Sequence, residues 1–297
     1  MGRKRSAALA AALLLTAAGT AAYITTRVLP RDHTPPQIQI EQEQLELSVS
    51  QGPQELLQGV TARDQRDGDV TDGIVVEQIG TLTPEHTAKV TYAAFDRSGN
   101  VAKASRTIHL TDYEPPRFGQ KQALVIRENS NEDVLTYMSA RDLIDGDISG
   151  QVKGNLVSDT VSLSKAGVHQ VEFRVTNSMG DTARITLPVD VLPAMTYQAE
   201  VNLTDYLVYV PKGSFFRAER YLKSLEVGSI SYPLDGSDPD VAVRLGRTSA
   251  VEKRHTALVE MKNNVNTAVP GLYSVTYTVT LDDQYTGFTR LNVVVEE

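Results

Sequence analysis

Apolar and polar side chains alternate along many short stretches of residues 32–297, the period expected of strands with one buried and one solvated face. These stretches are rich in β-branched and aromatic residues: IQI at 38–40, LELSV at 45–49, KVTYAAF at 89–95, HQVEFRV at 169–175, YSVTYTV at 273–279 and RLNVVVE at 290–296. Turn-forming residues recur about every ten positions, which favours antiparallel β-sandwiches over a βαβ fold.

Helical patterns are short and few. The three best candidates are ELLQGVTA at 55–62, EDVLTYMSA at 132–140 and RAERYLKSL at 217–225. Each is a one-turn piece, and the last is the most convincing of the three.

The N-terminal segment has a different pattern. Residues 6–26 are 21 uncharged and mainly apolar residues, preceded by Arg3, Lys4 and Arg5. About 20 such residues span a bilayer as a helix, and flanking cations stay in the cytoplasm. The segment therefore predicts a single-pass cell-membrane protein with a basic cytoplasmic tip and an extracellular body. The alternative is a cleaved signal peptide and a secreted body, because the small residues of TAAGTAA resemble a peptidase site.

Charge and composition narrow the class of protein. The formal net charge of −8 divides into +5 for residues 1–31 and −13 for residues 32–297. An acidic body would repel the phosphate backbone, which argues against nucleic acid as a partner. The chain has no cysteine, so disulfide frameworks and thiolate metal sites are excluded.

The sequence repeats itself at about 80-residue intervals. TPP at 34–36 recurs as EPP at 114–116, and TARDQRDGDVTDGI at 61–74 recurs as SARDLIDGDISGQV at 139–152. Residues 92–110, 173–191 and 277–295 align without gaps as a strand–turn–strand unit. We therefore predict an anchor or signal segment at 1–31 and three domains at 32–112, 113–192 and 193–297. The third domain is diverged, with YLKSLEVG in place of the Asp-rich string.

The order of these motifs resembles the bacterial surface Ig-like domain, a family related to the Ig-like modules of pesticidal crystal proteins. The resemblance rests on the Pro-Pro opening, the ARDxxDGD string, the strand pattern of PGLYSVTYTV at 270–279 and the FDRSGN hairpin at 95–100. The first two domains carry most of the pattern, and the third carries only its last two strands clearly. The resemblance implies an all-β fold of tandem Ig-like antiparallel sandwiches after an N-terminal transmembrane helix, displayed on a bacterial surface, and it implies no reaction.

The Asp-rich strings are the one place where the repeats suggest chemistry. Dense carboxylates can hold Ca²⁺, which takes six to eight oxygen ligands. The spacing lacks the alternating ligands and distal Glu of an EF-hand, whereas Asp before Gly favours turns through local hydrogen bonds. The sequence thus favours a repeated structural turn and leaves weak calcium candidates at Asp64, Asp67, Asp69, Asp142, Asp145 and Asp147.

No catalytic arrangement is found in the sequence. The five histidines form neither HxH nor HExxH, and no GxSxG, Walker or GxGxxG motif occurs. We therefore expect a non-catalytic protein with no cofactor. The string DGSDPD at 235–240 is interpreted as a solvated loop.

Two functions agree with these patterns. The first is an anchored surface protein whose repeats act as a stalk and as adhesion-like binding modules for a protein partner, with the contact placed in the diverged third domain. The second is an accessory module that binds carbohydrate or cell wall. A sugar platform needs exposed aromatic side chains, and in the absence of Trp these would come from Tyr206, Tyr209, Tyr221 and Tyr232.

Overall fold

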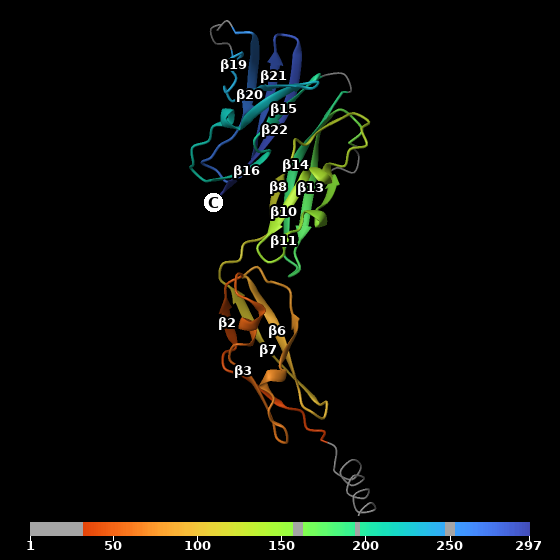
Figure 1. Ribbon diagram of the computed structural model, residues 1–297, viewed down its shortest axis with the longest axis vertical. Coiled ribbons are helices and arrows are strands. Elements are labelled where there is room, and N and C mark those ends of the chain that lie inside the picture. Colours follow the sequence, from red (N-terminus) through yellow and green to blue (C-terminus); the bar gives the residue numbers. More distant parts are fainter. Residues whose placement is uncertain (1–31, 157–162, 194–196, 247–252) are drawn as a thin grey trace, which may run out of the picture. The chain divides into compact units, whose positions relative to one another are not determined.

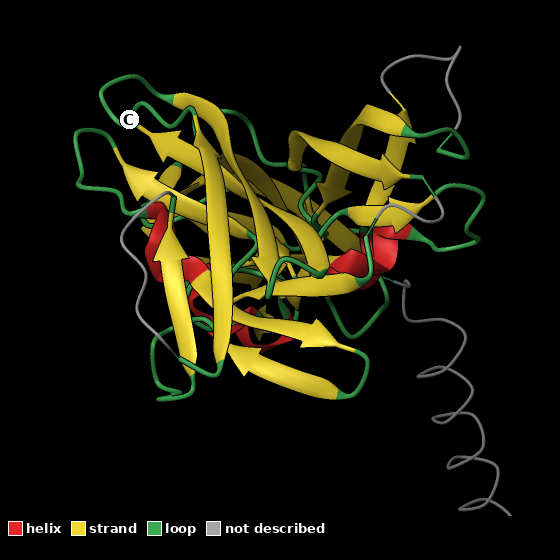
Figure 2. Ribbon diagram, turned by 90° about the horizontal axis from the view of Figure 1, so that it is seen from above, coloured by secondary structure: helices red, strands yellow, loops and turns green. Residues whose placement is uncertain are grey.

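A computed structural model describes residues 32–156, 163–193, 197–246 and 253–297. These residues form strands joined by turns, with helices limited to single 3₁₀ turns (Figure 2). The chain divides after Asp112 into two compact units. Within the described ranges, no helix is long and apolar enough to cross a bilayer. The predicted anchor at residues 6–26 lies outside these ranges.

The first unit is a two-sheet sandwich, called the first sandwich here. One sheet has the order β1-β3-β4 and the other the order β2-β7-β6-β5. All neighbouring strands are antiparallel except β2 and β7, which are parallel. The elements are β1 (Gln37–Ile40), β2 (Gln44–Leu47), η2 (Pro53–Leu57), β3 (Val60–Asp64), β4 (Gly68–Asp69), η3 (Thr71–Gly73), β5 (Val75–Ile79), β6 (Thr87–Phe95) and β7 (Val101–Leu110).

Strands β8 to β14 form the second sandwich, whose strands repeat this plan (Figure 1). Its sheets have the orders β8-β10-β11 and β9-β14-β13-β12, and the pair β9–β14 is again parallel. The elements are β8 (Arg117–Gln120), β9 (Val125–Arg127), η4 (Val134–Tyr137), β10 (Met138–Asp142), β11 (Gly146–Asp147), η5 (Ser149–Gln151), β12 (Lys153–Leu156), β13 (Gly167–Thr176) and β14 (Thr182–Leu192).

Strands β15 to β22 form the third sandwich. Its two layers belong to one eight-stranded sheet of order β18-β17-β15-β22-β21-β20-β19, with β16 also beside β22. The layers join where β15 pairs with β22 at Gly287. A Cβ there would lie 2.8 Å from the Ala199 carbonyl oxygen, so only glycine fits. The elements are β15 (Ala199–Leu203), β16 (Leu207–Pro211), η6 (Ala218–Tyr221), β17 (Leu222–Val227), β18 (Ile230–Pro233), β19 (Val241–Leu245), β20 (His255–Asn263), β21 (Gly271–Leu281) and β22 (Tyr285–Glu296).

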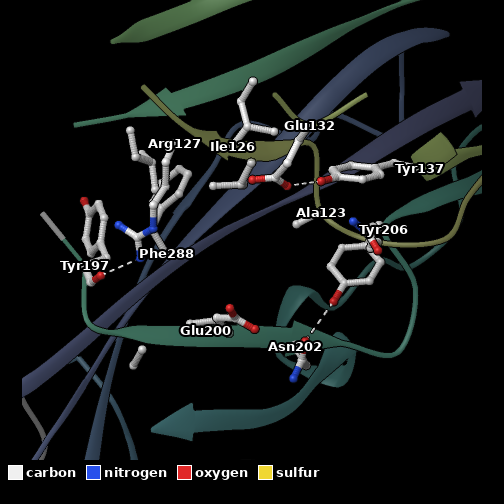
Figure 3. Close-up of a pocket in the computed structure, with 15 residues that line it drawn as sticks. Ala123, Ile126, Arg127, Glu132, Tyr137, Tyr197, Glu200, Asn202, Tyr206 and Phe288 are labelled. Atoms are coloured by element: carbon white, nitrogen blue, oxygen red, sulfur yellow. Dashed lines mark hydrogen bonds between the residues drawn. The ribbon is translucent and has the colours of Figure 1, made fainter. Parts of the chain in front are cut away.

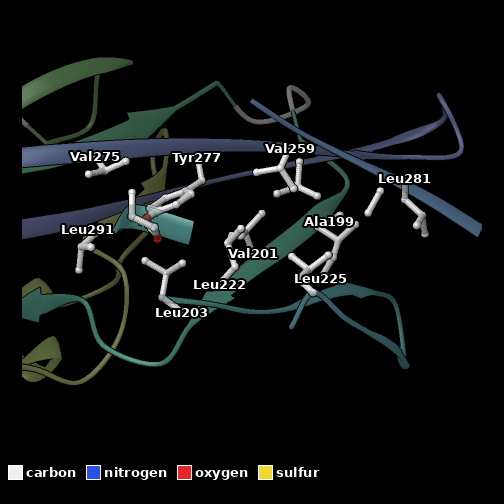
Figure 4. Packing of buried hydrophobic residues seen from close by; sticks show 14 of the residues in the cluster. Ala199, Val201, Leu203, Leu222, Leu225, Val259, Val275, Tyr277, Leu281 and Leu291 are labelled. Carbon is white, nitrogen blue, oxygen red and sulfur yellow. Dashed lines mark hydrogen bonds between the residues drawn. The ribbon is translucent and has the colours of Figure 1, made fainter. Parts of the chain in front are cut away.

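Each core lies between the two layers, filled by the alternate apolar residues that the sequence pattern predicts. Figure 4 shows side chains of β15 and β17 facing those of β20 and β21 in the third sandwich. Fully buried Tyr277 donates its hydroxyl to the carbonyl of Ala218 at 2.7 Å, and the aligned Tyr92 donates to the carbonyl of Leu56 at the same distance. These bonds help to satisfy the carbonyl at each 3₁₀ turn, and in the first sandwich Arg106 Nη2 also donates to the Leu56 carbonyl, at 2.7 Å.

Each of the three helix candidates contains a single 3₁₀ turn, as the sequence predicts. In the third candidate, only Ala218–Tyr221 form this turn, and Leu222–Val227 form strand β17. The register of β17 against β15 shifts between Asn202 and Leu203, so that Leu222 and Leu225 are both buried three positions apart. A β-bulge interrupts the alternation of a strand, and the resulting spacing imitates a helix. The other two helix candidates, likewise, hold only the single turns η2 and η4.

The second and third sandwiches belong to the same compact unit and share a polar junction. Arg290 of β22 donates two hydrogen bonds to the carboxylate of Asp190 in β14, at 2.6 and 2.7 Å. The two side chains are only 14% and 6% exposed. The guanidinium of Arg117 lies over the Tyr209 ring, with its central carbon 4.5 Å from the ring centre. The Tyr209 hydroxyl donates to the carbonyl of Phe118.

Candidate functional site

The first aspartate of each repeated string shapes a turn. Asp64 Oδ1 accepts hydrogen bonds from the backbone N–H groups of Arg66 and Asp67, at 2.7 and 2.8 Å. In the second sandwich Asp142 Oδ1 accepts the equivalent pair from Ile144 and Asp145, both at 2.9 Å. These are Asx-type bonds, which close the tight connection between two strands.

The second aspartate tethers this turn to a neighbouring hairpin. Asp67 accepts a hydrogen bond from the backbone N–H of Arg97 at 2.8 Å, and Asp145 accepts one from that of Ser178. In the first sandwich this bond joins the turn after β3 to the β6–β7 turn, and in the second it joins the turn after β10 to the β13–β14 turn. The string therefore holds two loops together in each sandwich.

The third aspartate caps the 3₁₀ turn that follows. Asp69 accepts from the N–H of Thr71, and Asp147 from that of Ser149, each at 2.9 Å. Hydrogen bonds from the Thr71 and Ser149 side chains, followed by these backbone bonds, hold the pKa values of Asp69 and Asp147 below their ordinary values. Five of the six weak calcium candidates belong to no group of three neighbouring acids among the described residues.

The exception is Asp64, which lies in a cluster that sequence reasoning missed. One oxygen each from Asp32, Asp64 and Asp96 lies within 4.8 Å of the others. Asp64 is 4% exposed and Asp96 8% exposed. Asp64 Oδ2 is buried and has no hydrogen-bond partner. The three residues come from the Pro-Pro entry, the repeated string and the end of β6.

Neighbouring donors hold two of these carboxylates in place. Asp96 Oδ1 accepts from the N–H of Asn100 at 2.8 Å, and its Oδ2 accepts from the Asn100 side-chain amide at 2.6 Å. Burial opposes the charge of Asp96, but these bonds and those from Ser98 and Gly99 outweigh it and lower the pKa. Asp32 Oδ1 accepts from the N–H of Thr34 at 2.9 Å.

The second sandwich has an amide at the position of Asp96. Asn177 donates from Nδ2 to Asp142 Oδ2 at 3.1 Å and to the hydroxyl oxygen of Tyr113 at 2.8 Å. Tyr113 in turn donates to Asp181 at 2.8 Å. The oxygen that has no partner in the first sandwich is therefore hydrogen-bonded in the second.

A pocket of about 270 Å³ opens where the second and third sandwiches meet (Figure 3). Polar and aromatic side chains from β9, the loop before η4, β15 and β22 point into it. The residues that line it are Gln122, Ala123, Val125, Ile126, Arg127, Glu132, Tyr137, Leu192, Tyr197, Ala199, Glu200, Val201, Asn202, Tyr206 and Phe288.

Side chains of the pocket are fixed by contacts with one another. Arg127 donates to the carbonyl of Tyr197 at 2.8 Å, and the Tyr197 ring stacks on Phe288 with centroids 5.9 Å apart. The hydroxyl of Tyr137 donates to the carboxylate of Glu132. Burial, followed by this bond, raises the pKa of Tyr137 to about 12, so the phenol stays neutral at physiological pH. The pocket thus offers both hydrogen-bonding groups and aromatic faces to a small polar ligand.

The four tyrosines proposed as a sugar platform do not form one. Tyr206 is 8% exposed and lines the pocket, where its hydroxyl lies 3.3 Å from Asn202 Oδ1. Tyr209 lies beneath Arg117, Tyr221 stacks against Phe216, and Tyr232 packs edge-on against His255.

The most exposed large apolar side chain among the described residues is Phe215, at 82%. It lies in the loop after β16, with the guanidinium of Arg217 5.3 Å from its ring centre. This loop is bonded to the β20–β21 loop by the Gly213 N–H and the Thr267 carbonyl, 2.7 Å apart. Val269, which is 51% exposed, lies in that second loop. We call residues 212–217 and 264–270 the Phe215 tip.

Comparison with known proteins finds no family model that matches the chain. An uncharacterized 81.3 kDa protein of Acholeplasma phage L2 is 34% identical over 103 residues, which are 34% of this chain and 13% of the phage protein. The pesticidal crystal protein Cry22Aa of Bacillus thuringiensis is 26% identical over 227 residues, which are 74% of this chain and 27% of that protein. The chain thus spans less than a third of the length of either relative.

Two solved structures match the chain at low sequence identity and low TM-score. Drosophila N-cadherin EC1-3 is 13% identical, with a TM-score of 0.29 over 86% of this chain and 98% of that chain. A Clostridium perfringens ZmpB structure of CBM51-2 in complex with GlcNAc and INT domains is 18% identical, with a TM-score of 0.22 over 56% and 31% of the two chains. The observed sheets by themselves assign the domains to the β-sandwich class and to no finer family.

Proposed function

We propose that this chain is a non-catalytic bacterial surface protein that binds a protein partner through the Phe215 tip, while its first two sandwiches act as a stalk. Membrane attachment through residues 6–26 is part of this proposal. Phe215 carries the argument, because it is 82% exposed on the same pair of bonded loops as Val269, which is 51% exposed, and exposed apolar patches mark interaction sites. Aromatic residues and arginine are enriched in protein–protein interfaces, and Phe215 and Arg217 are adjacent here.

The backbone of the tip is held in place, which favours binding. The Gly213–Thr267 hydrogen bond joins its two loops, and Ser214 N–H donates to the carbonyl of Pro211 at 3.1 Å. A preorganised loop loses less conformational freedom on binding, so more of the contact energy is retained as affinity.

The test is capture of envelope proteins by the tagged full-length chain. We expect Phe215→Ala to weaken capture at least tenfold, as for a central interface aromatic. Ile230→Ala is the matched control, because Ile230 is also exposed, at 56%, but lies on β18. Equal capture by wild type and Phe215→Ala would contradict the tip as the binding surface.

A glycan of the cell envelope is the second candidate ligand, and the junction pocket is the observation that favours it. The stacked Tyr197 and Phe288 offer an aromatic face, and Arg127, Glu132 and Asn202 offer hydrogen bonds to hydroxyl groups. Co-sedimentation with purified wall polysaccharide tests this candidate. Binding that Tyr197→Ala abolishes and Phe215→Ala leaves intact would place the function in the pocket rather than at the tip.

A further inference from the structure

We propose that Asp32, Asp64 and Asp96 bind one divalent cation, preferentially Ca²⁺, in the first sandwich. The proposal concerns this cluster alone and does not depend on which partner the third sandwich binds. It differs from a calcium site in the Asp-rich string, since Asp67 and Asp69 take no part in it.

The first argument is the orientation of Asp64. Its Oδ1 is engaged by two backbone N–H groups, so Oδ2 is the oxygen left for a ligand. This oxygen is buried and has no partner, and a buried polar atom without one is costly in a native fold. In the second sandwich the equivalent Asp142 Oδ2 accepts from Asn177, which aligns with Asp96. Asp64 Oδ2 therefore points toward Asp96, into the cluster.

The second argument is charge. None of the ion pairs found among the described residues involves any of the three carboxylates. Hydrogen bonds from Asn100 favour the charged form of Asp96 although the residue is buried. Like charges at this separation repel, most strongly between the buried Asp64 and Asp96, unless a cation or a proton lies between them. A bound cation removes the repulsion and supplies the missing partner of Asp64.

The third argument concerns the kind of ion. The cluster offers carboxylate oxygens, which are hard ligands typical of Ca²⁺ and Mg²⁺. The oxygens lie within 4.8 Å of one another, and two ligands on opposite sides of Ca²⁺ are about 5 Å apart at its usual bond length. Mg²⁺ requires a tighter octahedron and keeps more of its water, so an irregular set of three carboxylates from separate segments suits Ca²⁺ better.

The second sandwich provides a natural control within the same chain. Asn177 replaces the carboxylate of Asp96 with an amide that donates directly to Asp142 and Tyr113. This version of the site is satisfied by hydrogen bonds alone, so it requires no cation. We expect one Ca²⁺ per chain rather than two.

The experiment is calorimetric titration of the full-length chain in mild detergent, after removal of metal with EDTA, with CaCl₂ and separately with MgCl₂. We expect one Ca²⁺ site and Mg²⁺ binding at least tenfold weaker. Asp96→Asn imitates the second sandwich and should fold, because it gives Asp64 an amide donor. Its calcium affinity should fall at least 30-fold. Asp181→Asn is the matched control in the second sandwich and should leave affinity and stoichiometry unchanged.

Three results would overturn the proposal. These are no calcium binding to the wild type at millimolar CaCl₂, unchanged binding in Asp96→Asn, and loss of binding only in Asp181→Asn. Stabilisation by mild acid without any effect of Ca²⁺ would show that a shared proton, not a cation, neutralises the cluster. If Asp96→Asn does not fold, Asp32→Asn gives the same test, because Asp32 is only partly buried.

Discussion

The first and second sandwiches have the same strands in the same order, yet they handle one buried position in opposite ways. Where the first sandwich has Asp96 near Asp64, the second has Asn177 donating to Asp142. Exchanging an oxygen for an NH₂ group turns a repulsive pair of acids into a hydrogen-bonded pair. A repeated fold therefore preserves backbone geometry while it leaves the charge of a site free to change.

A second position separates the two sandwiches in the same manner. Asp190 of β14 lies in the buried pair with Arg290, whereas the aligned His109 of β7 makes a partly exposed contact with Glu46. The same strand position thus serves the junction with the third sandwich in one case and a surface contact in the other.

Breaking the junction should have the largest effect. Asp190→Ala leaves the guanidinium of Arg290 buried without its carboxylate, which costs about 4 kcal/mol in the free energy of unfolding of residues 113–297. Urea denaturation measures this loss. The control is Glu172→Ala, which breaks the exposed pair with Arg184 and should cost about 0.5 kcal/mol. Equal effects of the two variants would contradict a structural role for the buried pair.

Giving the second sandwich the acidic residue of the first should have the next largest effect. Asn177→Asp removes the donor to Asp142 and Tyr113 and places two carboxylates together, with an expected loss of about 3 kcal/mol at neutral pH. The loss should shrink as pH falls, because a shared proton relieves the repulsion. Asn155→Asp adds the same charge at an exposed site of β12 and should change the urea midpoint little. A pH-independent loss would indicate a packing defect instead.

The smallest effect is expected at the third aspartate of each string, which caps a 3₁₀ turn in both sandwiches. Asp69 and Asp147 have pKa values held below the ordinary value by Thr71 and Ser149, so the folded state favours their charged forms. Their contribution is present above the ordinary aspartate pKa and is lost as pH falls through the lower folded value. Asp69→Asn and Asp147→Asn should therefore flatten acid unfolding below about pH 4, followed by circular dichroism. A change in only one sandwich would show that the caps are not equivalent.

Much of the fold follows from the sequence because its causes are local. Alternation predicts strands such as β6, β13 and β21, whose burial patterns follow period two over most of their length. The Asp-rich string predicts its own turns, because the backbone N–H groups that donate to its first and third aspartates are no more than three positions away. The broken alternation of β17 has a non-local cause, since the bulge arises from the pairing of β17 with β15.

The acid cluster is harder to predict because Asp32, Asp64 and Asp96 are each 32 residues from the next along the chain. The sequences around Asp32 and Asp96 look like those of ordinary turns. The visible signal lies in the alignment of the repeats, where Asp96 stands opposite Asn177 next to an otherwise similar turn. The junction pocket has no such signal, because Arg127, Tyr197 and Phe288 are brought together only by the packing of two domains.

The parallel pairing of an early strand with the last strand of each sandwich has a mechanical consequence. Pulling on the two ends of a sandwich draws these strands in opposite directions along their common axis. Their hydrogen bonds are then sheared together instead of opening one by one, so rupture requires greater force than unzipping. The register covers five residue pairs for β16–β22, four for β2–β7 and three for β9–β14. A chain tethered to a cell under fluid drag would therefore yield first at β9, as force spectroscopy can measure.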